Sequence, residues 1–212
     1  MLVKTFPEFF ASYNVYEIVR DVLSKKMREK DVNSVIRELI NSEAKPDNYL
    51  KKLALVLKRH VHATKASNII MEIKGKLKNL IDVTIQPEEI EISKNGKAML
   101  KIYVQNKLET MIKIKVGVQQ IDRKFTALLY DPVKNFSYTK LIKSQIVGPG
   151  KAGVFKFIIK PYVYGIQDLY ELNNKKKLIV TLGTQAEADG IDGVKTRVTK
   201  IPVKISKVKI GV

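Results

Sequence analysis

Apolar residues recur every three or four positions through the first third of the chain, which predicts amphipathic helices. The first segment covers residues 7–29, and Pro7 suits the first turn of a helix. Its apolar stripe consists of Phe9, Tyr13, Tyr16, Val19, Leu23 and Met27. A second, shorter helix is predicted to have Asp31 as its N-cap and to end at Asn41 and Ser42. Its apolar positions are Val32, Val35, Ile36, Leu39 and Ile40.

A third helix is predicted to open at Pro46 and to reach a break at Ser67 and Asn68. Its apolar face consists of Leu50, Leu53, Ala54, Leu57 and Val61. Helical spacing resumes at Ile69 and continues to about residue 79. Each of these helices must bury one face against another element, so the sequence predicts a small helical bundle.

The hydrophobic period changes from about 3.6 to 2 near residue 81, which predicts β-strands from there on. Strands are predicted near 83–85 and 90–92 and over 99–105, 111–118, 153–160, 177–182 and 198–210. Asn95-Gly96 is a strong signal for a two-residue hairpin turn, and Gly148-Pro149-Gly150 is a second turn. Pro202 indicates an edge strand or a bulge near the end of the chain.

These patterns predict an α+β fold in which an N-terminal helical bundle precedes an all-β, immunoglobulin-like sandwich. The change of period places the boundary between two domains, which are predicted to cover residues 1–79 and 80–212. The chain has 212 residues, enough for two small domains with real cores.

Three stretches resemble prokaryotic immunoglobulin-like sandwich modules of the cell-adhesion-related type. They are VTIQPEEIEISKNGKAMLKIYVQNKLETMIKIKVGVQ (83–119), GPGKAGVFKFIIKP (148–161) and GVKTRVTKIPVKI (193–205). Ile102, Val104 and Asn106 stand in the V-x-V-x-N place of those modules, and Pro149 and Gly150 in their Pro-Gly place. The resemblance covers about residues 81–210 and implies a module that binds or spaces without catalytic residues. The helical third has no counterpart in it, and residues 120–146 are longer and less regular than its pattern.

Composition narrows the possible chemistry and the compartment. The chain has no cysteine, which removes disulfides, thiolate zinc sites and cysteine nucleophiles. Met1–Phe10 lacks the pattern of a signal peptide, and no apolar run approaches the ~18 residues of a membrane span. We therefore expect a cytoplasmic protein without a membrane span. Abundant lysine and isoleucine, without tryptophan, are typical of thermophile proteins.

No catalytic or metal-binding pattern stands out. His60 and His62 lie two apart on a predicted helix and point in different directions, so they cannot share a metal. Glu187, Asp189 and Asp192 depart from the spacing of a calcium loop. The carboxylates Glu88, Glu89 and Glu91 are predicted on an exposed strand beside lysines. We therefore expect no enzyme, no cofactor and no small-molecule substrate.

The formal net charge of +18 is spread over both halves of the chain. Such a charge attracts phosphate backbones, anionic lipids or acidic proteins, although lysines also serve simply to solvate outer faces. The predicted third helix carries a basic cluster, Lys51, Lys52, Lys58, Arg59 and Lys65. This cluster is a candidate nucleic-acid contact or a solvated helix face.

The segment PYVYGIQDLYEL (161–172) carries Tyr162, Tyr164 and Tyr170 after a predicted strand. Exposed tyrosines are typical of protein interfaces, and the alternative is a loop that folds back over the end of the sandwich. The leading functional hypothesis is a non-enzymatic binding or scaffold protein that acts through protein–protein contacts, self-association included. The alternative is a basic nucleic-acid-binding accessory protein that contacts the phosphate backbone nonspecifically.

Overall fold

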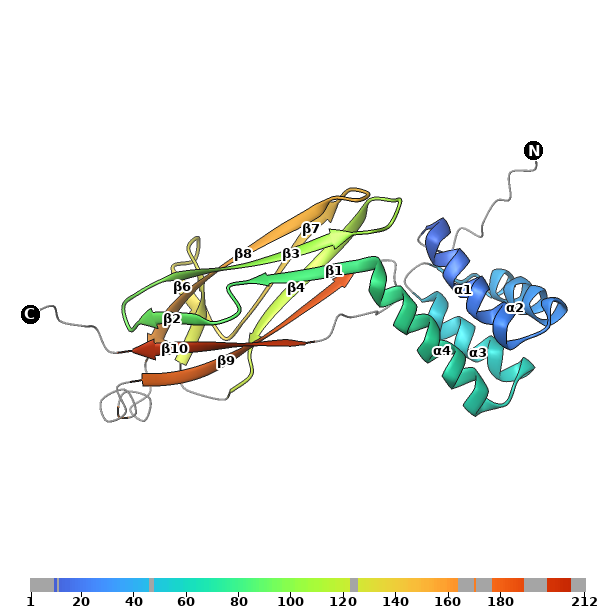
Figure 1. Ribbon diagram of the computed structural model, residues 1–212, viewed down its shortest axis with the longest axis horizontal. Helices are drawn as coiled ribbons and strands as arrows, with labels where there is room; N and C mark the ends of the chain where they lie inside the picture. Colours follow the sequence, from blue (N-terminus) through green and yellow to red (C-terminus); the bar gives the residue numbers. More distant parts are fainter. Residues whose placement is uncertain are drawn as a thin grey trace, which may run out of the picture.

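A computed structural model describes residues 10, 12–45, 48–122, 126–163, 170, 177–188 and 198–206. Four helices come first and two five-stranded sheets follow. Figure 1 shows the helices gathered at one end of an elongated sandwich, with the last helix leading directly into the first strand. The predicted α+β architecture, a helical bundle followed by a β-sandwich, is confirmed.

The helices are α1 (Tyr13–Lys26), α2 (Glu29–Asn41), α3 (Tyr49–His60) and α4 (Ala63–Leu77), and a 3₁₀ turn (Lys78–Leu80) follows. Ser12 caps α1, because its Oγ accepts a hydrogen bond from the Val15 N–H at 3.3 Å. Helix α1 therefore begins at Tyr13, and the predicted start at Pro7 lies outside the described residues. Asp31 is not the N-cap of α2; it lies in the first turn, where its carboxylate binds Arg28 Nε at 3.0 Å.

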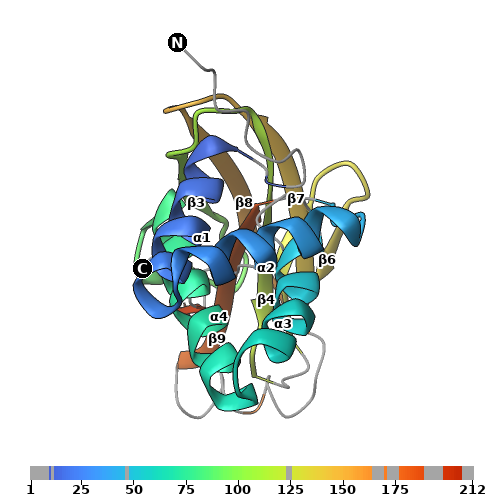
Figure 2. The same ribbon diagram turned by 90° about the vertical axis from the view of Figure 1, so that its right-hand side faces the viewer.

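Two short links of matching backbone geometry organise the bundle. Met27 and Arg28 join α1 to α2, and Val61 and His62 join α3 to α4. Met27 and Val61 have nearly the same φ and ψ, −139°/159° and −142°/158°, and both pack against the core. Each link thus contains an extended residue whose apolar side chain packs inward between two helices. α1 then packs on α4 and α2 on α3, and Figure 2 views this bundle from its outer end.

The prediction of one long third helix broken at Ser67 and Asn68 is wrong. The break falls at Val61 and His62, and Ser67 and Asn68 lie inside α4. Both of these polar side chains are exposed to solvent, where they do not compete with the helical hydrogen bonds. Ile40 also departs from prediction, because it is half exposed although it continues the apolar spacing of α2.

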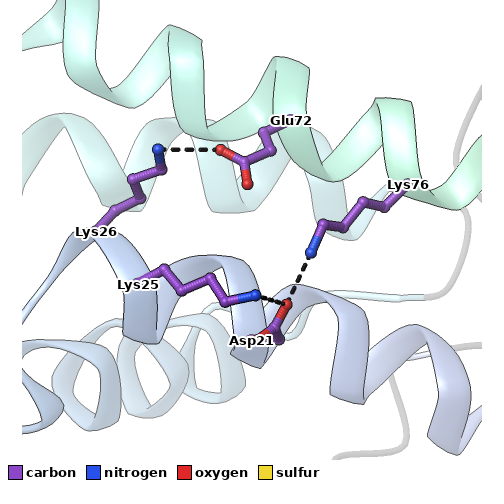
Figure 3. A network of polar contacts seen from close by, with 5 residues as sticks. All are labelled: Asp21, Lys25, Lys26, Glu72 and Lys76. Carbon is purple, nitrogen blue, oxygen red and sulfur yellow. Dashed lines mark hydrogen bonds and ion pairs between the residues drawn. The ribbon is translucent and has the colours of Figure 1, made fainter.

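Ion pairs tie α1 to α4 on the surface of the bundle (Figure 3). The Asp21 carboxylate accepts hydrogen bonds from Lys76 Nζ at 2.7 Å and from Lys25 Nζ at 2.9 Å. Lys26 lies 3.2 Å from Glu72 of α4. The hydrogen bonds from Lys76 and Lys25 lower the pKa of Asp21, and the bond to Asp21 raises the pKa of Lys76.

The first sheet has the strand order β1-β3-β8-β5-β6, and the second has the order β2-β10-β9-β4-β7. Strands of the first sheet are β1 (Ile81–Gln86), β3 (Ala98–Asn106), β5 (Thr126–Asp131), β6 (Phe136–Tyr138) and β8 (Ala152–Val163). Strands of the second sheet are β2 (Ile90–Ser93), β4 (Ile112–Gln120), β7 (Lys140–Val147), β9 (Lys177–Ala188) and β10 (Thr199–Ser206).

The first strands divide between the two sheets, as in immunoglobulin-like domains. β1 pairs antiparallel with β3, and after Pro87 the chain crosses to the other sheet, where β2 pairs in parallel with β10. The predicted hairpin at Asn95-Gly96 is therefore wrong, because its flanking strands β2 and β3 lie in different sheets. Asn95 and Gly96 do form a tight turn, in which the Gly96 N–H donates to the Ser93 carbonyl at 2.9 Å, but neither has positive φ.

Side-chain alternation follows the predicted faces in the central strands. Leu100, Ile102 and Val104 of β3 are buried, as are Phe155, Phe157 and Ile159 of β8. β4 likewise turns Ile112, Ile114, Val116 and Val118 inward. The opposing apolar faces of the two sheets form the core of the sandwich.

Asn106, at the end of β3, ties two loops together. Its buried Nδ2 donates to the carbonyls of Thr110, Val147 and Gly148 at 2.8, 3.0 and 3.1 Å. Its Oδ1 accepts from the Leu108 N–H at 2.9 Å. The last of those carbonyls opens the predicted Gly148–Gly150 turn, which is confirmed and in which Gly150 has a φ of +63°.

Pro202 is predicted from the sequence to mark an edge strand or a bulge, but it lies in an interior strand whose register with β9 is unbroken. It pairs with Thr181 of β9, whose N–H and C=O point away from β10 toward Asp122 and Ile121. The Pro202 nitrogen therefore faces the β2 side of β10. Pairing with β2 begins only at Val203, so the missing N–H costs no ladder hydrogen bond.

Candidate protein-interaction surface

Strand β7 forms one edge of the second sheet and is the longest of the four edge strands described. Its side chains alternate between the two faces. Leu141 and Val147 turn toward the core, whereas Ile142, Ser144 and Ile146 turn outward. Ile142 is 59% exposed and Ile146 is 68% exposed. Two large apolar side chains thus stand in solvent, each two residues from Ser144.

The backbone of β7 offers free hydrogen-bonding groups at the same three residues. The Gln120 N–H donates to the Thr139 carbonyl, which fixes the even-numbered residues of β4 as those that bond to β7. In this register Leu141, Lys143, Gln145 and Val147 face β4 with their backbone groups. Ile142, Ser144 and Ile146 then direct theirs away from the sheet, where no described residue pairs with them.

Two inward side chains of β7 close the open side of the sandwich. Lys143 Nζ donates to the Lys156 carbonyl of β8 at 2.6 Å and lies 5.4 Å from the ring centre of Phe157. The Gln145 side chain lies over Gly153 of the same strand. These contacts fix β7 to the first sheet and draw the Lys143 charge away from the edge.

A shallow groove of about 450 Å³ runs over the outer face of the second sheet beside β7. Gly117 of β4 and Gly183 of β9 form its floor, because neither has a side chain to fill it. Ile121 and Val198 lean over Gly183, and an added Cβ there would lie 2.9 Å from Ile121 Cδ1. Ile142 borders the groove from β7, with Lys115 and Lys140 also on its rim. The groove is therefore mainly apolar at its centre, and its margin carries charges of both signs, since Glu187 lies there with the two lysines.

The tyrosines that the sequence predicts as partner contacts do not lie on β7. Tyr162 is 59% exposed on β8, in the first sheet, and Tyr170 is 68% exposed. Tyr164 lies outside the described residues. The exposure of Tyr162 and Tyr170 leaves both accessible to a partner, but their role in binding stays a prediction.

The predicted basic cluster is only partly a single surface. Lys51, Lys58, Arg59 and Lys65 are exposed and Lys52 is half-buried. Arg59 is held by Glu38 at 3.3 Å. A cleft of about 460 Å³ between the two helix links is lined by Lys65 together with Lys25, Lys26, Arg28 and His60. Of the five predicted residues only Lys65 lines this cleft. The other cations that line it come from the ends of other helices, and only folding of the bundle brings them together.

Both histidines and two of the remaining candidate carboxylates have structural partners. His60 Nε2 lies 2.7 Å from Glu38 Oε1, and His62 Nδ1 accepts from the Thr64 N–H at the start of α4. Lys204 binds Glu89 and Glu91, and the hydrogen bond to Glu89 raises its pKa. Glu88 is exposed, and Asp189 and Asp192 lie outside the described residues. Among the residues that the structure describes, no three acidic or histidine side chains are grouped to hold a metal.

No protein-family model matches the chain, and no curated protein matches it. Three solved structures illustrate what it is similar to. Activated Escherichia coli alpha-2-macroglobulin is 8% identical over 60% of this chain and 9% of its own, with a TM-score of 0.39. A FixG-related protein from Vibrio parahaemolyticus is 11% identical over 60% of this chain and 94% of its own, with a TM-score of 0.33. A CARDB domain from Pyrococcus furiosus, solved with di-metal ions, is 16% identical over 60% and 91%, with a TM-score of 0.33.

The fold defines the class: an α+β protein in which four helices precede an immunoglobulin-like sandwich. The chain departs from the usual order of that sandwich, since the β5–β6 hairpin of the first sheet comes between β4 and β7 of the second. Within the described residues, no helix is long and apolar enough to cross a membrane. Because fold alone does not fix function, function has to be inferred from the chain's own surfaces.

Proposed function

We propose that this protein is a non-enzymatic binding or scaffold protein that acts through protein–protein contacts. The single observation that carries the proposal is the outer face of the second sheet at β7, where Ile142 and Ile146 stand exposed beside an apolar groove. Exposed aliphatic side chains that share one face of an edge strand are costly in water unless a partner covers them.

The helical bundle fits this role as an appended unit on one end of the sandwich. Several of its described carboxylates are engaged in ion pairs: Asp21 with Lys25 and Lys76, Glu38 with His60 and Arg59. The pairs of Asp21 with Lys76 and of Glu38 with His60 and Arg59 join helices to each other, whereas Asp21–Lys25 lies within α1.

The test is binding by a purified partner. A protein recovered with the chain from its source cells would be purified and titrated against wild type and the double variant Ile142→Lys/Ile146→Lys. We expect at least a tenfold loss of affinity, since two charges would replace the apolar contact. Ile179→Lys, at another exposed isoleucine on an interior strand of the same sheet, is the matched control. Equal binding by wild type and the double variant would contradict the proposal.

A second candidate function is nonspecific nucleic-acid binding, favoured by the cleft that Lys25, Lys26, Arg28 and Lys65 line. Phosphate contacts there would weaken steeply with salt. Neutralising Lys25, Arg28 and Lys65 together should reduce the salt slope by roughly one for each phosphate that these side chains bind. A second variant, neutralised at Lys51, Lys52 and Lys58, shows whether the α3 surface contributes to the salt slope as the cleft does. No binding of DNA or RNA at low salt would exclude this candidate.

A further inference from the structure

We propose that the partner of β7 is the β7 strand of a second copy of this chain, paired antiparallel about Ser144. This inference rests on the proposed function, because it names the occupant of the same surface. The sequence of β7, KLIKSQIV, is complementary to itself in one register. With Ser144 opposite Ser144 of the second copy, Ile142 lies opposite Ile146 on both sides of the twofold axis.

Backbone geometry allows this register. Ile142, Ser144 and Ile146 are the residues whose N–H and C=O groups point away from β4, and they are the ones that would exchange hydrogen bonds with the second copy. The pairing would form two cross-strand isoleucine pairs and satisfy an edge that is open in the described part of the chain. The twofold axis makes the interface isologous, so both β7 edges are used up and association stops at the dimer.

Neighbouring registers are less favourable. Centring the pair on residue 143 sets Lys143 against Lys143, and like charges directly opposite are destabilising. Centring it on residue 145 sets each Ile146 against Ser144 and leaves both isoleucines without an apolar partner. Only the Ser144 register pairs Ile142 with Ile146 and sets Lys143 opposite Gln145, which separates like charges.

Electrostatic repulsion is the main effect that opposes dimerisation, because each copy carries a net charge of +18. The lysine nearest the axis on the outer face is Lys115, one strand in from Ser144. Three inter-strand spacings then separate the two Lys115 residues, about 14 Å. This exceeds the Debye length of about 8 Å at physiological ionic strength, so their repulsion is largely screened. On the inner face the two Lys143 residues are diagonal neighbours, about 7–8 Å apart. Inward-pointing charges of this kind are a common protection of edge strands, and here each Lys143 ammonium binds the Lys156 carbonyl of its own copy at an exposed site.

The absence of native cysteine makes the register directly testable. Single-cysteine variants at positions 142 to 146 would be oxidised mildly and resolved by non-reducing electrophoresis. We expect Ser144→Cys to form a disulfide-linked dimer, because a hydrogen-bonded antiparallel pair sets its Cα atoms about 5.5 Å apart, within disulfide range. Ile142→Cys alone should not cross-link, since its own copy lies four residues away along the strand, about 13 Å.

Met99→Cys, at an exposed position of β3, measures cross-linking by random collision. The double variant Ile142→Cys/Ile146→Cys should cross-link as Ser144→Cys does. A dimer from Lys143→Cys or Gln145→Cys in place of Ser144→Cys would overturn the register. Cross-linking at or below the Met99→Cys level throughout would overturn self-pairing. If a different protein still bound β7 and bound Ile142→Lys/Ile146→Lys more weakly, the proposed function would stand while this inference failed.

Discussion

At the residue scale, Asn106 shows how one amide joins the β3–β4 loop to the turn before β8. Its Nδ2 donates to three carbonyl oxygens and its Oδ1 accepts from one N–H, and the Asn106 side chain is buried. We expect Asn106→Ala to lower the free energy of unfolding by about 1–3 kcal/mol, because buried polar groups would be left without partners. Gln105→Ala, at the exposed neighbouring position, should change it by less than about 0.5 kcal/mol. Urea denaturation of the two variants compares them, and equal midpoints would refute the role of Asn106.

Asp21 gives a pH dependence whose sign follows from its lowered pKa. A carboxylate with a depressed folded-state pKa adds stability above its unfolded value, here 3.8, and loses it as pH falls through the folded value. Wild type should therefore lose more stability between pH 7 and pH 3 than Asp21→Asn, which has no charge to lose. The effect is small, because the pair is exposed. Denaturation midpoints at both pH values measure it, and an equal loss in the two proteins would argue against the Asp21–Lys76 contact.

At the scale of elements, the sequence predicts strands best where one face is buried and the other polar. β3, β4 and β8 meet that condition, and their faces agree with prediction. β7 escaped prediction because apolar residues lie on both of its faces: Leu141 and Val147 inward, Ile142 and Ile146 outward. A period of two cannot be recognised in such a strand, and its exposed isoleucines are the feature on which the proposed function rests.

The pairing of elements is harder to predict than their existence. Asn95-Gly96 is flanked by strand-like sequence and has the chemistry of a hairpin turn, yet it carries the chain from one sheet to the other. Local turn chemistry cannot distinguish these outcomes, since β2 gains its partner from β10, more than a hundred residues away. The break between α3 and α4 escapes prediction for a similar reason: Val61 leaves the helix to pack against a core that exists only after folding.

At the scale of the whole molecule, we propose that residues 1–79 and 80–212 are separate folding units. A described polar contact between them is the hydrogen bond from the Asn14 N–H to Glu109 Oε1, at an exposed site. The fragment 80–212 expressed alone should give a β-type circular dichroism spectrum and unfold cooperatively, because both sheets lie within it. A predominantly helical or unfolded spectrum would contradict the proposed boundary.

We propose that the exposed face of β7 binds another protein surface, and that this partner is the β7 strand of a second copy. Pairing of two eight-residue edges makes a small interface, so we expect a weak dimer with a Kd of roughly 1–100 µM. Because both copies are strongly basic, the dimer should tighten as salt rises, whereas binding to nucleic acid would weaken.

Sedimentation velocity over a concentration series, at low and at high salt, measures this dimerisation. We expect a monomer–dimer equilibrium for wild type and for Ile179→Lys that shifts toward dimer at high salt. We expect a monomer at every concentration for Ile142→Lys/Ile146→Lys, since lysines would replace both cross-strand isoleucine pairs. A wild-type chain that remains monomeric throughout, or a double variant that dimerises as well as wild type, would contradict this proposal.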